Sequence, residues 1–217
     1  MSYPMTPQDA TNYLVENFIA TKETAYDLEK DFCYDDLFYY SNGVSKNCLI
    51  PTDNNTNFVI KWSFSGCDEA EKEVDIYKKA VDEGIEYFFP KTEILCTIED
   101  IVFVIQERID FSCYDLPDMY RDKYTHITQT ASDYIVSKME KSIHNVTGSK
   151  PELNKLWAKM ALVLYGKARV KKLCNFICEN DINDLHSSNL GYKKNKPVIL
   201  DFSGYHYQTI TTSFSSF

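Results

Sequence analysis

The stretch Asn183–Tyr205, NDLHSSNLGYKKNKPVILDFSGY, contains three polar residues whose order and spacing favour one kind of chemistry. Asp184 and Asn189 are five positions apart, and Asp201 follows twelve positions later, directly after the apolar run PVIL. A short apolar run between polar segments predicts a buried strand, which here ends just before Asp201. Phosphoryl transfer from a nucleotide requires a carboxylate that accepts the substrate proton, together with oxygen ligands for Mg²⁺. The three residues supply these groups in that order.

These motifs resemble those of the protein kinase-like superfamily. Asp184 to Asn189 (DLHSSN) resembles its catalytic loop, in the form with a histidine two positions after the aspartate that is seen in aminoglycoside phosphotransferases and bacteriophage-encoded kinases. Asp201 to Gly204 (DFSG) resembles its metal-binding motif, with one extra residue before the glycine. The resemblance implies that Asp184 is the catalytic base, that Asn189 and Asp201 bind Mg²⁺, and that His186 contacts the transferred phosphate.

Two residues further upstream match the same superfamily, which has a lysine on the third strand and a glutamate on the helix that follows. The segment VIKW places Lys61 on the third predicted strand, and Glu73 lies on the next predicted helix. An ion pair between them would hold the lysine ammonium against the α- and β-phosphates of ATP. Glu69 and Glu71 are neighbours that could replace Glu73 in this role.

Two segments are candidates for binding the rest of the nucleotide. QERI resembles the hinge between the two lobes, so Glu107 and Arg108 are the candidates whose backbone would bind adenine; the alternative is an ordinary strand end. SNGVSKN stands where the superfamily has a glycine-rich loop over the phosphates. Gly43 alone leaves fewer backbone N–H groups able to approach, and Ser45 and Lys46 are candidates to substitute, with a solvated turn as the alternative.

Periodicity predicts an α+β chain. Residues 37–109 alternate as strand, strand, strand, helix, strand, strand, which favours a five-stranded antiparallel sheet with one helix, the N-lobe of a protein kinase-like two-lobe fold. Residues 1–36 form an N-terminal helical extension that begins with a capping box at Thr6 to Asp9. Residues 110–217 form a reduced, mostly helical C-lobe, with one long helix expected over 152–179.

Composition excludes several classes of protein. The 217 residues carry a net charge of -9, which disfavours nucleic acid as a partner, and no run approaches the roughly 20 apolar residues of a membrane span. The start of the sequence lacks the pattern of a signal peptide. The seven cysteines form no CxxC pair and are expected to be reduced and buried. These features predict a soluble, cytoplasmic protein, in the host cytoplasm if a phage or pathogen encodes it.

The sequence also departs from the superfamily. It ends 13 residues after Gly204, so the usual activation segment and the peptide-docking helices beyond it are expected to be absent. Ile182 and Asn183 replace the usual His-Arg or His-Gly before the catalytic aspartate, which predicts activity that is constitutive or depends on a partner. This reduction resembles the minimal kinases of bacteriophages and bacterial pathogens, which act on host proteins.

Three functions remain open from the sequence. The first is a minimal kinase that uses ATP and Mg²⁺ to phosphorylate Ser or Thr of a partner or host protein. The second is a kinase-fold binding module, a pseudokinase that acts by occluding its partner, which the missing docking platform and the Tyr-rich composition favour. The third is a small-molecule kinase, favoured by the DLH form of the loop and disfavoured by the lack of later helices to build a substrate pocket.

Overall fold

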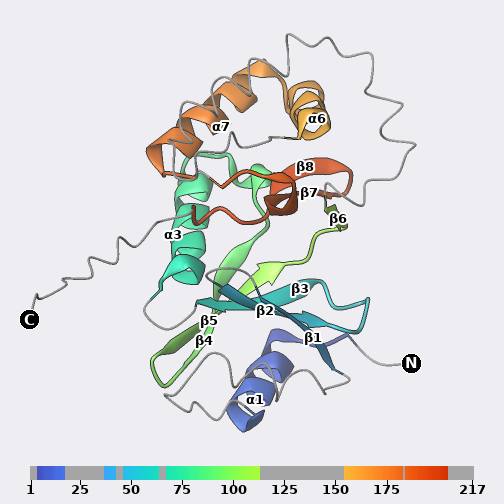
Figure 1. Ribbon diagram of the computed structural model, residues 1–217, viewed down its shortest axis with the longest axis vertical. Helices are drawn as coiled ribbons and strands as arrows, with labels where there is room; N and C mark the ends of the chain where they lie inside the picture. Colours follow the sequence, from blue (N-terminus) through green and yellow to red (C-terminus); the bar gives the residue numbers. More distant parts are fainter. Residues whose placement is uncertain are drawn as a thin grey trace, which may run out of the picture.

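A five-stranded antiparallel sheet forms the first half of the computed structural model (Figure 1). The structure describes residues 4–17, 37–42, 46–63, 67–112, 154–182 and 184–204. The strand order is β1-β2-β3-β5-β4. The strands are β1 (Phe38–Asn42), β2 (Lys46–Pro51), β3 (Phe58–Ser63), β4 (Thr92–Ile98) and β5 (Ile101–Glu107).

One face of this sheet packs against helix α1 (Pro7–Asn17). Alternate residues of β3, including Ile60 and Trp62, are buried on this face together with Leu14 of α1. The helix begins with the expected capping box, because Asp9 Oδ2 accepts from the backbone N–H of Thr6 at 2.9 Å. The N-terminal helix therefore belongs to the same core as the sheet.

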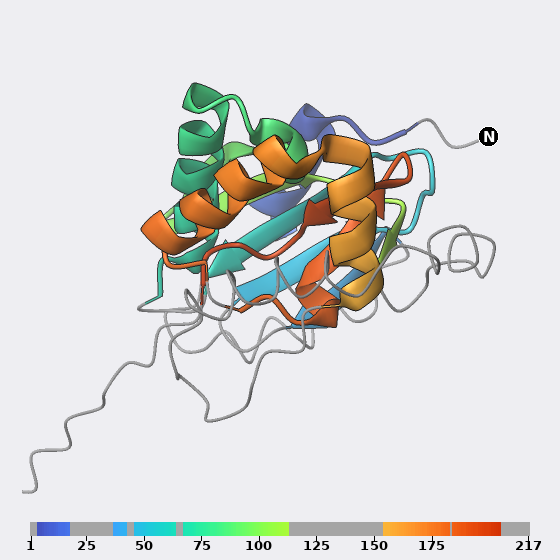
Figure 2. The same cartoon turned by 90° about the horizontal axis from the view of Figure 1, so that it is seen from above.

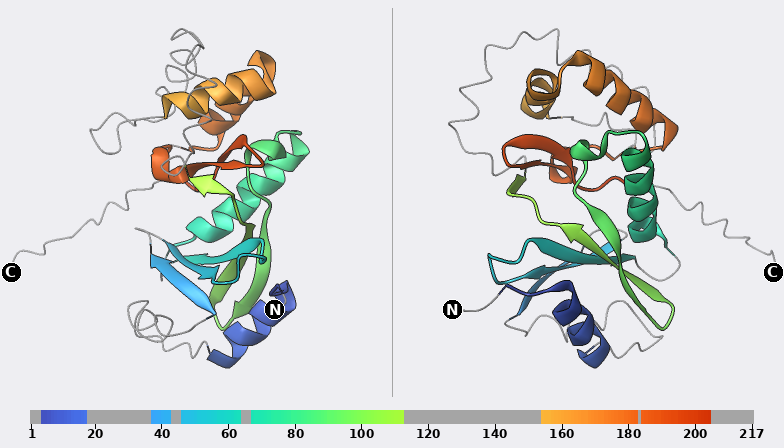
Figure 3. Two further views of the ribbon diagram at one scale, coloured as in Figure 1. Left: turned by 90° about the vertical axis from the view of Figure 1, so that its right-hand side faces the viewer. Right: turned by 180° about the vertical axis from the view of Figure 1, so that it is seen from behind.

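The opposite face of the sheet packs against helix α3 (Glu69–Asp82), as the side views show (Figure 3). Ala70 and Val74 of the helix contact Val104 of β5, which points away from the α1 side. Glu73 lies on the same inner side of the helix and is fully buried. The helix ends near Gly84, whose φ of +65° is the left-handed conformation that glycine adopts readily.

The second part of the described chain contains two helices and a small sheet, which Figure 2 shows from above. The indole Nε1 of Trp157 donates to the carbonyls of Gly191 (3.2 Å) and Val198 (3.1 Å), which fixes the first helix to the sheet. The sheet has the order β6-β7-β8. The elements of this part are β6 (Phe111–Ser112), α6 (Lys155–Tyr165), α7 (Lys167–Glu179), the short 3₁₀ helix η2 (Ser187–Asn189), β7 (Leu190–Lys193) and β8 (Lys196–Ile199). Another short 3₁₀ helix, η1 (Glu86–Phe88), lies earlier in the chain, between α3 and β4.

The single long helix expected over 152–179 is wrong. Gly166 separates α6 from α7 with φ +82° and ψ 158°, a conformation outside any helix, and its N–H closes the first helix on the carbonyl of Leu162. The hydrophobic periodicity continues across the break because both helices bury side chains in one core. Periodicity alone therefore did not reveal where the chain turns.

We expect Gly166→Ala to lower the free energy of unfolding by about 1–3 kcal/mol, because only glycine adopts this backbone conformation without strain. A methyl group at this position meets no atom within 4 Å, so the cost is purely conformational. Gly84→Ala is the matched control: its site is equally open, and its left-handed conformation costs an L-residue only about 1 kcal/mol. Urea denaturation of both variants measures whether Gly166→Ala loses more stability than Gly84→Ala. Equal losses would contradict this expectation.

The α+β class is confirmed, and so is the five-stranded antiparallel sheet with its order of three strands, one helix and two strands. Strands β6 and β7 were not predicted. Helices expected between residues 112 and 146 lie outside the described residues, as does the turn at 43–45. No helix in the described ranges is long and apolar enough to cross a membrane.

Candidate active site

The buried carboxylate of Glu73 is the centre of a polar network between the sheet and α3. Its Oε2 accepts from Lys61 Nζ at 3.1 Å, so the expected Lys–Glu ion pair is present. The same oxygen accepts from Gln106 Nε2 at 3.3 Å, and the backbone N–H of Phe202 lies 3.4 Å from Oε1. A fully buried charge requires such partners, because desolvation would otherwise be very costly.

A second lysine, Lys46 of β2, binds the other side of Glu73. Its ammonium donates to Glu73 Oε1 at 2.8 Å, to Asp201 Oδ1 at 2.5 Å and to Ser203 Oγ at 2.8 Å. Its side chain is only 7% exposed. The alternative in which Lys46 belongs to a solvated turn is therefore wrong.

The pairing of β2 with β3 explains why both lysines reach the same carboxylate. Cys48 lies opposite Lys61 and Lys46 opposite Ser63, so the two lysines project from the same face of the sheet on neighbouring strands. Intervening residues such as Leu49 point to the opposite face, toward α1. This face thus presents two ammonium groups to the inner side of α3.

The charges in this network shift the pKa of their members. Burial opposes the charged form of Asp201, but the positive charges of Lys46 and Lys61 outweigh it and hold the pKa of Asp201 at about 2. Burial likewise opposes the charged form of Lys46, and the carboxylates of Glu73 and Asp201 outweigh it and raise its pKa. Two ammonium groups therefore balance two carboxylates in this network.

The loop before β7 brings the remaining predicted residues together. Asn189 Nδ2 donates to the backbone carbonyl of Asp184 at 2.8 Å and to its Oδ2 at 3.1 Å. His186 Nδ1 accepts from the N–H of Ser188 at 3.2 Å, and its Nε2 lies 3.6 Å from Asp184 Oδ1. The Asp184 side chain is 40% exposed. This carboxylate is thus fixed through Oδ2, has His186 beside Oδ1, and is partly exposed as a whole.

The β7–β8 hairpin connects this loop to the Glu73 network. Leu190 pairs with Ile199, and the N–H of Leu200 donates to the carbonyl of Asn189 at 2.8 Å, so Asn189 and Asp201 lie at the same end of the hairpin. Lys61 Nζ also donates to the carbonyl of Leu200 at 3.2 Å. A continuous chain of contacts therefore runs from Lys61 to Asp184.

The donor set at this end of the hairpin fits Mg²⁺, which prefers oxygen ligands and usually combines one or two carboxylates with substrate phosphates. Asp201 offers a carboxylate, and Asn189 offers its amide oxygen because its nitrogen is bonded to Asp184. In the part of the chain that the structure describes, no group of three or more His, Cys, Asp or Glu side chains could hold a metal alone. Phosphate oxygens and water would complete the coordination.

The prediction for the hinge needs a correction. The N–H of Glu107 already donates to the carbonyl of Lys91 at 2.8 Å, and that of Arg108 to the carbonyl of Asn57 at 2.7 Å, so neither is free for adenine. Their side chains also have structural partners, since Glu107 pairs with Lys193 of β7 and Arg108 binds carbonyls of the β2–β3 turn. The N–H groups of both residues therefore bond to the segments on either side of β5, an inner strand of the sheet, and not to a ligand.

The remaining candidates have different positions. Gly43 and Ser45 lie outside the described residues. Glu71 is not in the network, because its Oε2 accepts from Ser63 Oγ at 2.9 Å. Glu69 is buried in the first turn of α3 with no recorded contact to either lysine. Of the three glutamates, only Glu73 contacts Lys61 within the described chain.

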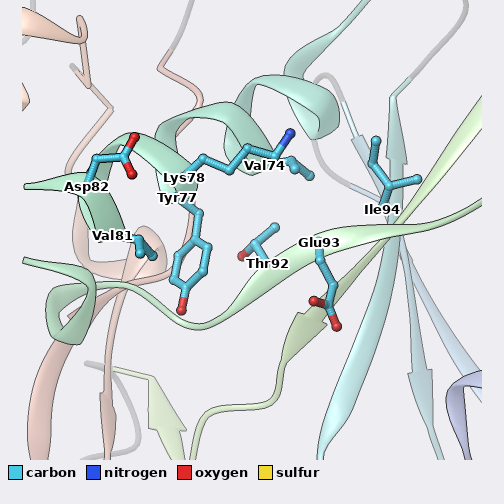
Figure 4. Close-up of a pocket in the computed structure, with 8 residues that line it drawn as sticks. All are labelled: Val74, Tyr77, Lys78, Val81, Asp82, Thr92, Glu93 and Ile94. Atoms are coloured by element: carbon cyan, nitrogen blue, oxygen red, sulfur yellow. The ribbon is translucent and has the colours of Figure 1, made fainter. Parts of the chain in front are cut away.

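A groove lies on the other side of α3, against the start of β4 (Figure 4). Its only hydrogen-bonded link to the network is Thr92, whose Oγ1 accepts from Gln106 Nε2 at 3.2 Å within the described chain. It contains none of the predicted catalytic or metal-binding residues. Its lining consists of Val74, Tyr77, Lys78, Val81, Asp82, Thr92, Glu93 and Ile94.

No protein-family model matches the chain, and no curated protein matches its sequence. Among solved structures, a ternary complex of APH(2")-IIa with streptomycin and ATP is similar over 82% of this chain and 69% of its own. The two share 13% sequence identity, and the TM-score is 0.34. A TM-score this low does not show a shared function.

Proposed function

We propose that this protein is a phosphotransferase that uses ATP and Mg²⁺ to phosphorylate Ser or Thr side chains of a partner or host protein. The observation that carries the proposal is the continuous set of contacts from Lys61 and Glu73 through Leu200 and Asn189 to Asp184. A lysine fixed by a buried glutamate, a pair of metal ligands and a separate carboxylate are the parts that phosphoryl transfer needs.

The phosphate end of the site would be formed by Lys61. Glu73 orients its ammonium and the carbonyl of Leu200 holds it at the hairpin, so the charge is placed before the nucleotide arrives. Asp201 and Asn189 would hold the metal, and bound Mg²⁺ would neutralise the charge on the phosphates. For adenine, Ile109 replaces Glu107 and Arg108 as the candidate, because no backbone bond of its N–H is recorded within the described residues.

Asp184 would accept the proton of the substrate hydroxyl. Its Oδ2 is bonded to Asn189, so Oδ1, which has no hydrogen bond within the described residues, is the oxygen that would take that proton. His186, with Nε2 3.6 Å from the same oxygen and a side chain 47% exposed, would face the transferred phosphate. The exposure of both side chains supports a substrate presented on the surface of another protein.

We expect Mg-ATP to stabilise the protein by about 2.7 kcal/mol when the nucleotide is at 100 times its dissociation constant, since it binds only the folded state. Thermal unfolding with and without Mg-ATP measures this. ATP with a chelator should have a much smaller effect, because Asp201 and Asn189 act through the metal. A melting curve that millimolar Mg-ATP leaves unchanged would contradict nucleotide binding, and with it the enzyme.

One observation favours a second candidate, a binding module without catalysis. Asp201, a predicted metal ligand, is paired with the ammonium of Lys46 at 2.5 Å, so its charge already has a partner within the protein. Mass spectrometry of the protein incubated with Mg-ATP and a candidate protein substrate separates the two. Phosphate on Ser or Thr supports the enzyme, and its absence in a protein that binds Mg-ATP supports the module.

A further inference from the structure

We propose that Lys46 is a second phosphate-binding lysine: its ammonium pairs with Asp201 in the structure and would bind the nucleotide polyphosphate when Asp201 binds the metal. This inference rests on the proposed function, because it names a further residue that would hold the nucleotide. The site would then grip the phosphates with two lysines, Lys46 from β2 and Lys61 from β3.

The contacts of Lys46 place it at the metal-binding carboxylate itself. All three of its donors are used, on Glu73, Asp201 and Ser203. The described contacts of Lys61 are different, since its ammonium reaches Glu73 and the carbonyl of Leu200. The two lysines share Glu73 but are otherwise not equivalent: Lys46 donates to the side chain of Asp201, and Lys61 donates to the carbonyl of Leu200.

Electrostatics favours a change of partner for Lys46 when a metal ion binds Asp201. A divalent cation on Asp201 would repel an ammonium 2.5 Å from the same carboxylate, unless an anion lies between them. Phosphate oxygens provide that anion, and a lysine binds phosphate well as a point charge. Asp201 is 32% exposed, so the exchange takes place where a ligand can reach.

Glu73 does not need Lys46 for its own neutralisation, because Lys61 already donates to it at 3.1 Å. Burying an ammonium group costs free energy unless the group is paired. Here the ammonium of Lys46 is buried beside that of Lys61. The ammonium of Lys46 lies at Asp201, the proposed metal ligand, so phosphates bound to that metal would come within its reach. One lysine ammonium would then supply a positive charge in place of several backbone N–H groups.

The test is calorimetric titration of wild type and Lys46→Met with adenosine, AMP, ADP and ATP, the latter two with Mg²⁺. We expect Lys46→Met to weaken ADP and ATP by about 10- to 100-fold, as loss of a hydrogen bond to a charged group does, and adenosine by less than about 2-fold. Lys72→Met is the matched control: this lysine lies on α3, pairs with Asp68 at the surface and should change none of the four affinities.

The outcomes separate the two proposals. Wild type that binds none of the four ligands overturns the proposed function and this inference with it. Wild type that binds ATP while Lys46→Met binds it equally well, or loses adenosine and ATP to the same degree, overturns the role of Lys46 alone. If Lys46→Met does not fold, the charge-balanced pair Lys46→Met with Glu73→Gln is compared with Glu73→Gln alone, and an equal ATP affinity of the two overturns the inference.

Discussion

Glu73→Ala is expected to lower the free energy of unfolding by about 3–5 kcal/mol, the usual cost of removing one partner from a buried ion pair. The side chain is fully buried and receives hydrogen bonds from Lys46, Lys61, Gln106 and the N–H of Phe202. Alanine would leave two ammonium groups with only Asp201 to balance them. Urea denaturation followed by circular dichroism measures the loss, and phosphotransfer should fall with it.

The sequence alone gives Glu73 a single partner, Lys61. The structure raises the expectation because Glu73 holds two lysines and links α3 to the segment at Phe202. Glu71→Ala is the matched control two positions away, and it should cost only about 1 kcal/mol because it removes one half-buried hydrogen bond from Ser63. Equal losses in the two variants would contradict the central role of Glu73.

The sequence predicted those parts of the site that depend on local periodicity. Helical spacing groups Glu73 with Ala70 and Val74 on one side of α3, and that side faces the sheet. Strand alternation places the side chain of Lys61 on the face of the sheet opposite to Ile60 and Trp62, which is the face toward α3. Helical periodicity, strand alternation and the order of the elements were therefore sufficient to predict the ion pair between Lys61 and Glu73.

The role of Lys46 depended on strand register, which local patterns do not specify. Whether Lys46 projects toward Glu73 or toward α1 changes with a shift of one residue in the β2–β3 pairing. Its partners, Asp201 and Ser203, are 155 and 157 residues away in the chain. The sequence does show a lysine at the start of an alternating strand. A solvated lysine at a strand end gives the same pattern, so the pattern does not distinguish the two.

The predictions of the hinge and of one long helix were wrong for related reasons. A free backbone N–H has no signature in the sequence, and those of Glu107 and Arg108 are used by Lys91 and Asn57 from distant segments. Gly166 was visible, but a glycine inside a periodic apolar pattern is also tolerated within a helix. Only the packing of both helices on one core decides that the chain turns there.

Asp184→Asn is expected to lower turnover by roughly 10² or more while leaving folding and Mg-ATP affinity close to those of wild type. The amide retains an oxygen that can accept from Asn189 Nδ2, as Asp184 Oδ2 does at 3.1 Å, so the loop keeps its structure. Its nitrogen then replaces Oδ1, which is the atom proposed to accept the substrate proton. Calorimetry for binding and single-turnover transfer from labelled ATP measure the two quantities separately.

Asp181→Asn is the control for this variant, because Asp181 is an exposed carboxylate three positions earlier and its left-handed backbone is one that asparagine tolerates. It should leave turnover and binding unchanged. Asp184→Asn also separates the two functional classes: the biological effect of the protein disappears with the proton acceptor if it is an enzyme, and survives if it is a binding module. A folded Asp184→Asn protein that binds Mg-ATP, transfers no phosphate and keeps its full effect on its partner would therefore exclude catalysis as the function, although the site would remain a nucleotide site.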